Sequence, residues 1–393
     1  MPSSSALATL NAVVSSALSL IGQLEAVVAS IAAQNRGDHG AVQPIGDRQP
    51  PASASFDALS LAHDSAVLIK AHATKISLFI INEPFTPTAI ARVVGELAAG
   101  PLPGLASAVQ LCAAERYTET VQRDLAWQSG RVFRELRELL SRIPKDGRIL
   151  SDQRKNAAAG SATGKGSIAT TGVLWNACDD VVAFAVRGFS GNLVRKVEQL
   201  KDTLKDIMEE LKEWGEETED EPSDEGGDSS SEDDEVDQIT ESLELARISS
   251  TQSTQDMLDD LMNSQQCIPR DDPNKIRERL ESCLKRLRLT TLLYQAAIKR
   301  RFKPLPLLPP GTGESSVSAR LDEILPLLKR IPEKCGSLAL AFYDLDPSEI
   351  DRLMDQCFFD AFAASELLVK PWNGQKDEFT DWALRFQVEI KKS

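Results

Sequence analysis

The sequence predicts an all-α protein made of antiparallel helical bundles, with two helical halves joined by an acidic disordered hinge. Apolar residues recur from Leu193 to Leu211 at alternating steps of four and three, which places them on one face of a helix. From Glu216 to Asp237 the chain carries thirteen acids and neither Lys nor Arg. This stretch therefore has too few apolar side chains to form a buried core. No segment alternates apolar and polar residues with a period of two between turn signals, which argues against strands.

Residues 1–34 are expected to form one helix of a bundle. The apolar side chains between Leu7 and Ile31 mark a single face, with Ser and Ala on the opposite face. A signal peptide would begin with basic residues, and polar side chains spaced through the segment argue against a membrane span. The linker that follows, residues 35–55, is rich in Gly, Pro and Ser and is predicted to be flexible.

Residues 56–214 are expected to form an N-terminal helical bundle that ends in the seam helix, which carries the Leu193–Leu211 stripe. Thr86 and Pro87 predict a helix start, because a hydroxyl can cap the first turn and proline needs no amide partner there. Trp175 and Cys178, three residues apart, are expected in the core. The predicted helices are 56–82, 87–99, 105–143 with a break near Tyr117, 171–186, and the seam helix after an interruption at 188–191, with a loop at 145–168.

The hinge is assigned to residues 215–240 and a C-terminal helical region to residues 241–393. Prolines separate several of the amphipathic segments in this region. The predicted helices are 238–262, 275–303, 317–331, 333–343, 347–369 and 377–391. Neighbouring helices are expected to pack antiparallel.

No catalytic, cofactor-binding or metal-binding residue is predicted. The six cysteines are scattered without a CxxC pair, which is typical of reduced thiols, and three dispersed histidines are too few for a metal site. Gly160 to Gly166 fails as a phosphate loop, because Ala159 stands where the first glycine is needed and Gly166 where Ser or Thr would hold magnesium. These observations favour an interaction protein without a cofactor over an enzyme.

The acidic hinge dominates the charge of the chain. The formal net charge is −15, and the thirteen acids of the hinge account for all but −2 of it. Such a charge repels nucleic acid and anionic membrane surfaces. Phosphorylation is predicted at four serines that lie directly before acidic clusters, in the context favoured by acidophilic kinases: Ser223, Ser229, Ser230 and Ser231. An inert, self-repelling linker is the alternative interpretation.

The helix at 275–303 is strongly basic and allows three interpretations: a solvated bundle face, pairing with the acidic hinge, or a nucleic-acid surface. It lacks the interleaved aromatic residues and reader motifs of nucleic-acid-binding proteins. Other aromatic residues gather near the C-terminus, where they could anchor a protein partner or belong to the core. The candidate partner-binding residues are Trp372, Phe379, Trp382 and Phe386.

The order of several short blocks resembles the cyclin-D-binding protein (GCIP) family. In the N-terminal half the blocks are Phe79 to Pro87 and Val173-Leu-Trp175-Asn-Ala-Cys178, followed by a helix pair that leads into an acidic, Ser-rich segment. In the C-terminal half they are Leu321-Asp-Glu-Ile324, Leu338-Ala-Leu340 with Tyr343, and a helix near Leu353 to Leu368. The resemblance covers most of residues 56–390, and the chain departs from the family by insertions at 35–55, 145–168 and 240–270.

The resemblance implies an all-helical bundle protein without catalytic activity. It implies binding to D-type cyclins and to helix-loop-helix transcription factors, a restraining effect on cell-cycle progression and transcription, and residence in both nucleus and cytoplasm. The alternative hypothesis is a vinculin-like helical-bundle scaffold or cytoskeletal adaptor with a mechanical role.

Overall fold

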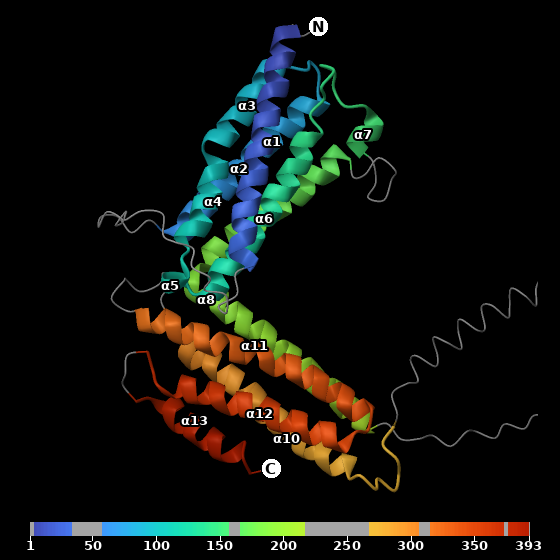
Figure 1. Ribbon diagram of the computed structural model, residues 1–393, viewed down its shortest axis with the longest axis vertical. Coiled ribbons are helices and arrows are strands. Elements are labelled where there is room, and N and C mark those ends of the chain that lie inside the picture. Colours follow the sequence, from blue (N-terminus) through green and yellow to red (C-terminus); the bar gives the residue numbers. More distant parts are fainter. Residues whose placement is uncertain are drawn as a thin grey trace, which may run out of the picture. The chain divides into compact units, whose positions relative to one another are not determined.

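The computed structural model describes residues 4–33, 57–156, 166–216, 267–305, 315–372 and 376–392. Every regular element in these residues is a helix, so the all-α prediction is confirmed (Figure 1). The linker at 35–55, the hinge beyond Glu216 and the expected helix at 238–262 lie outside the described residues.

The chain forms two compact units, and neither unit corresponds to one of the expected halves. Unit 1 contains residues 1–196 and 299–325, and unit 2 contains residues 197–298 and 326–393. The boundary expected at the hinge therefore does not separate the units. The division falls instead within the seam helix and at two further points in the C-terminal region.

Unit 1 is built from long helices that pack against one another (Figure 1). Helix α1 contacts α3, α4 and α6, while α2 contacts α3 and α4. The elements are α1 (Ser4–Ala33), α2 (Ala58–Ile81), α3 (Pro87–Ala99), α4 (Pro101–Leu111), α5 (Ala114–Tyr117), α6 (Glu119–Ser141), α7 (Asp152–Asn156), the first part of α8 (Ser167–Glu216) and the first part of α11 (Ser315–Tyr343).

The N-terminal helix α1 is a bundle helix, as predicted. Leu10, Val14, Ile21 and Val28 are buried at steps of four or seven, which places them on one face. The Ser and Ala residues of the opposite face are exposed. By length and composition alone, α1 is also the one helix in the described ranges that could cross a membrane.

Capping side chains differ between the starts of α2 and α3. Asp57 caps α2 by accepting a hydrogen bond from the Leu59 N–H at 3.0 Å. The prediction that Thr86 caps α3 is wrong, because its hydroxyl donates to the Pro84 carbonyl at 3.1 Å instead. Pro87 does occupy the first turn, as predicted.

The segment predicted as one broken helix at 105–143 is three helices. Helix α4 begins earlier than predicted, at Pro101, which fits the first turn because proline needs no amide partner there. The break near Tyr117 is confirmed. Thr118 has a φ of 74°, outside the helical region, and its side-chain oxygen accepts from the Val121 N–H to begin α6.

Helix α8 is interrupted at Gly188, where the backbone has φ 69° and ψ −175°. Glycine adopts this positive φ without the steric cost of a Cβ atom. The interruption predicted at 188–191 is thereby confirmed. The side-chain amide of Asn192 donates to the carbonyls of Phe184 and Gly188, both at 2.8 Å, and so satisfies backbone acceptors at the kink.

Unit 2 packs α10, α12 and α13 together, with α11 and the second part of α8 (Figure 1). Its elements are α10 (Ile276–Ala297), the later part of α11 (Ser315–Tyr343), α12 (Pro347–Val369) and α13 (Glu378–Glu389), while a π-helical turn, η1 (Ile298–Phe302), lies at a unit boundary. The predicted helix at 347–369 is confirmed as α12.

Helix α11 differs from the prediction, because one helix replaces the two expected at 317–331 and 333–343. Pro332 lies inside it, where proline typically costs about 3 kcal/mol. Ile331 and Cys335, on either side of this proline, are fully buried. Their burial offsets that cost and keeps the helix continuous.

The seam of α8 is covered by the C-terminal region. Trp214 packs against Phe342 and Tyr343 of α11, with ring centroids 6.2 and 5.4 Å apart. The Tyr343 hydroxyl also donates to the Glu210 carboxylate at 2.9 Å. These contacts explain why the second part of α8 belongs to unit 2 rather than to an N-terminal half.

Candidate protein-binding surfaces

Helices α2 and α8 pair along unit 1 through three side-chain contacts. The hydroxyls of Ser77 and Thr171 lie 3.0 Å apart, the Trp175 indole N–H donates to the Thr74 hydroxyl at 3.1 Å, and Lys70 Nζ lies 2.6 Å from the Asp179 carboxylate. Each contact is about one turn further along α8 and one turn back along α2. The two helices therefore run antiparallel in a fixed register.

Exposed apolar side chains follow this pairing on both helices. Residues seven or eleven positions apart share a helix face, and these side chains have that spacing. The set, called here the α2–α8 strip, is Val67, Leu78, Ile168, Trp175 and Val186. Val186 is the most exposed of them, at 71%.

The prediction that Trp175 is a core residue is wrong. Its ring is partly exposed, because the indole N–H is bound by Thr74 at the edge of the α2 contact. Cys178, three positions further, is fully buried as predicted, and burial raises the pKa of its thiol to about 12. The three-residue spacing between Trp175 and Cys178 could not show that only one of them is buried, since Trp175 lies at the border of the buried face.

Charges near the α2–α8 strip are largely neutralised. Lys70 and Asp179 form an ion pair between the two helices, next to Trp175. Burying the strip would therefore remove mainly apolar surface from water, which stabilises a complex by about 25 cal/mol per Å² before the costs of association. An exposed apolar row on a helix pair is a typical surface for an amphipathic helix of a partner.

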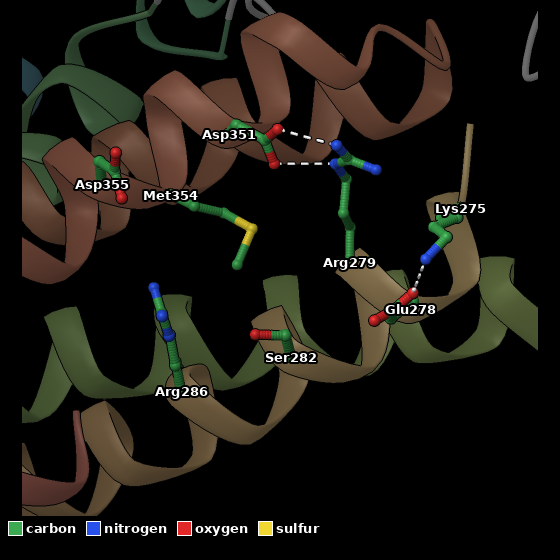
Figure 2. A pocket seen from close by; sticks show the side chains of 8 residues that line it. All are labelled: Lys275, Glu278, Arg279, Ser282, Arg286, Asp351, Met354 and Asp355. Atoms are coloured by element: carbon green, nitrogen blue, oxygen red, sulfur yellow. Dashed lines mark hydrogen bonds and ion pairs between the residues drawn. The ribbon is translucent and has the colours of Figure 1, made fainter. Parts of the chain in front are cut away.

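A second candidate surface is a pocket of about 470 Å³ between α10 and α12 in unit 2 (Figure 2). Figure 2 shows Met354 pointing into it from α12, and Ser282 and Arg286 facing it from α10. The full lining is Lys275, Glu278, Arg279, Ser282, Arg286, Asp351, Met354 and Asp355.

Several charges of this pocket are already paired with each other. The Arg279 guanidinium donates two hydrogen bonds to the Asp351 carboxylate, at 2.8 and 2.9 Å, and Lys275 Nζ lies 3.3 Å from Glu278. The hydrogen bonds to Arg279 lower the pKa of Asp351, and the same bonds raise the pKa of Arg279. A general acid or base needs a pKa near the working pH, so this pair serves to link α10 with α12.

The four C-terminal aromatic residues differ in how far they are exposed. Phe379 and Phe386 are only 2% and 3% exposed, so of the two interpretations left open by the sequence these residues fit the core. They face inward from α13, and Trp382 lies against both rings at 5.6 and 5.7 Å. Trp372 and Trp382 are partly exposed, and their role in partner binding stays a prediction.

Sequence reasoning missed the apolar residues that unit 2 does expose. These are Leu292, Leu340, Phe359, Leu384 and Val388. In α13 a signal was available, because Leu384 and Val388 are four residues apart and out of phase with the seven-residue step from Phe379 to Phe386. The seven-residue pair marks the buried face, and the other pair marks the solvent face.

The other sites considered from the sequence are the candidate phosphoserines, a metal site and the cysteines. The four candidate phosphoserines lie outside the described residues. Within the described ranges, no group of three or more His, Cys, Asp or Glu residues could hold a metal ion. All six cysteines are free thiols, which agrees with the sequence-based expectation.

Comparison with known proteins finds a family match in the N-terminal part of the chain. The sequence profile described as "Grap2 and cyclin-D-interacting, N-terminal" matches residues 62–217, which include the whole α2–α8 strip. An uncharacterized protein of Schizosaccharomyces pombe is 29% identical over 139 residues, which cover 35% of this chain and 38% of that protein. No solved structure matches. The match over residues 62–217 supports the resemblance to the Grap2 and cyclin-D-interacting (GCIP) family that was noted in the sequence.

Proposed function

We propose that this protein is a non-enzymatic helical adaptor that regulates cell-cycle progression and transcription by binding D-type cyclins or helix-loop-helix factors. The observation that carries the proposal is the family match over residues 62–217, in a family whose description names interaction with cyclin D. The all-helical fold supports it, because bundle surfaces recognise partner helices well.

The α2–α8 strip is the surface on which the partner binds in this proposal. It lies wholly inside the matched residues, and its exposed side chains span about three turns of α2 and about five turns of α8. An amphipathic helix with apolar residues at i, i+4, i+7 and i+11 would bury Val67, Trp175 and Val186 together. The Lys70–Asp179 pair would lie beside it and favour partners that place a polar side chain there.

Regulation of this adaptor is assigned to the acidic hinge. Phosphorylation at Ser223 and at Ser229 to Ser231 would add about −1.5 to −2 charges at each site. By analogy with the family, we expect the protein in both nucleus and cytoplasm. Fluorescence microscopy of the tagged full-length chain tests the location, and exclusion from the nucleus would contradict it.

The binding proposal is tested by calorimetric titration of the full-length protein with a purified D-type cyclin and with a helix-loop-helix domain. Val186→Asp should weaken binding at least about tenfold without lowering the melting temperature, since it places a charge in the buried contact. Leu340→Asp is the matched control, because Leu340 is 62% exposed and lies outside the family-matched residues. It should bind as the wild type does.

Two results would argue against these assignments. If the wild type binds neither partner up to its solubility limit but co-sediments with actin filaments, the vinculin-like scaffold hypothesis replaces the adaptor. If Val186→Asp binds normally while wild-type binding is measurable, the adaptor function stands and the α2–α8 strip is not its surface.

A further inference from the structure

The core of unit 2 holds three buried thiols, each from a different helix. Cys283 lies on α10, Cys335 on α11 and Cys357 on α12, and all three are fully buried. Burial raises the pKa of Cys283, and a hydrogen bond with Cys357 together with burial raises the pKa of Cys335. These two groups are therefore neutral thiols near pH 7.

Cys335 and Cys357 face each other across the contact between α11 and α12. Their Sγ atoms are 2.8 Å apart. A disulfide bond is about 2.05 Å long, so the two sulfur atoms would have to approach by only about 0.8 Å to bond. The helices are held together beside the thiols, because Lys334 Nζ lies 2.7 Å from the Asp360 carboxylate.

We propose that Cys335 and Cys357 form an oxidative modification site, at which a hydroperoxide converts the two thiols into an intramolecular disulfide. One sulfur, as a thiolate, attacks the peroxide O–O bond and becomes a sulfenic acid, while the other peroxide oxygen leaves as an alcohol or as water. The second sulfur then attacks the sulfenic sulfur, and the displaced hydroxide takes the second thiol proton to form water. The pair loses two electrons and two protons, and one peroxide is reduced.

Burial controls the rate of this reaction. The thiolate is the nucleophile, so a buried neutral thiol must be exposed by local opening before it reacts. Cys267 is only partly buried and should react with peroxide sooner. Mild denaturant should accelerate formation of the Cys335–Cys357 bond, because it raises the population of the open state.

The disulfide would join α11 to α12 across a sequence separation of 22 residues. Closing this loop restricts the unfolded chain and should raise the melting temperature of the oxidised protein. Reduction with dithiothreitol should return it to the original value, since the thiols are regenerated.

Peptide mapping of the full-length protein tests the proposal. The protein is treated with hydrogen peroxide, alkylated with iodoacetamide under denaturing but non-reducing conditions, and digested with trypsin. Cleavage after Arg352 separates Cys335 from Cys357, and cleavage after Lys285 releases Cys283 on a third peptide. The expected product is a linked Cys335–Cys357 peptide pair with two fewer alkylated thiols, both reversed by dithiothreitol.

Matched variants make the result decisive. Cys283→Ser removes the third thiol of the same core and should keep both the linked pair and the rise in melting temperature. Cys335→Ser or Cys357→Ser should abolish both. Recovery of Cys335 and Cys357 on separate alkylated peptides from the oxidised wild type would overturn the proposal. Linkage mainly to Cys283 in the wild type would also overturn it, as would loss of the Cys335–Cys357 linkage in Cys283→Ser. None of these outcomes depends on whether Cys335→Ser or Cys357→Ser folds.

Discussion

The side-chain amide of Asn192 donates to the main-chain carbonyl of Gly188 at 2.8 Å and so fixes the kink of α8. The same amide nitrogen donates to the Phe184 carbonyl, and the Asn192 side-chain oxygen accepts from Arg187 Nε at 3.0 Å. Because the side chain is buried, these bonds replace the contacts with water that it would otherwise lose. One amide group thus specifies how the helix continues beyond the glycine.

Replacing Asn192 with Leu should destabilise the protein by about 2 kcal/mol, because buried carbonyls of the kink would lose their donor. Urea denaturation followed by circular dichroism measures the change. Asn176→Leu is the matched control, since Asn176 lies on the same helix with an exposed side chain. Equal stability losses in the two variants would contradict the assigned role.

Tyr117 ties α5 to the start of α2. Its hydroxyl donates to the Asp57 carboxylate at 3.1 Å and accepts from the Ala58 N–H at 3.2 Å. Burial and the nearby Asp57 charge raise the pKa of Tyr117 to about 12, from 10. The folded protein therefore holds this proton more tightly than the unfolded chain does.

The resulting stability is fully present below pH 10 and is lost as the pH rises towards 12. Tyr117→Phe should cost about 1 kcal/mol at neutral pH and flatten the fall in stability between pH 10 and 12. Denaturant melts across this window measure both effects. An unchanged slope in the variant would show that Tyr117 does not contribute to it.

Two glycines of unit 2 should respond oppositely to alanine. A Cβ atom at Gly215 would overlap the buried Leu280 side chain, so Gly215→Ala should destabilise by about 1–3 kcal/mol through overpacking. A Cβ at Gly336, inside α11, would meet no atom within 4 Å. Gly336→Ala should therefore stabilise by about 0.5–1 kcal/mol, and thermal melts with the same shift for both would refute the packing argument.

Asp322 links α11 to α6, because its carboxylate accepts a hydrogen bond from the Glu119 N–H at 2.9 Å. That amide is in the first turn of α6, where the helix has no internal acceptor for it. Asp322→Ala should cost about 1 kcal/mol, and Asp322→Asn should cost less because it keeps an acceptor oxygen. If Asn were as damaging as Ala in chemical denaturation, the carboxylate charge rather than this bond would be the main contribution.

Local signals explain why individual helices could be predicted well. Asp346 and Pro347 begin α12 with a side-chain cap and a proline in the first turn, and both are readable in the sequence. Gly188 likewise allowed the kink in α8 to be predicted. The continuity of α11 through Pro332 could not be predicted, because it depends on core contacts that override the local preference of proline.

The arrangement of helices and the exposed surface depend on contacts between distant residues. Nothing near Trp214 in the sequence shows that Phe342 covers it, so the division into units could not be read from the hinge. Trp175 and Val186 are apolar residues on an apolar helix, and only the pairing with α2 reveals that they remain at the surface. The candidate site was therefore the part that the sequence predicted least.

The packing of Trp214 on α11 has a practical consequence for dividing this protein. A protease that cuts after Glu216 should leave a nicked molecule whose two pieces still copurify, because their shared aromatic contacts remain intact. Expressing residues 1–214 alone should instead yield an insoluble fragment, since its last turns would present uncovered Leu211 and Trp214 to water.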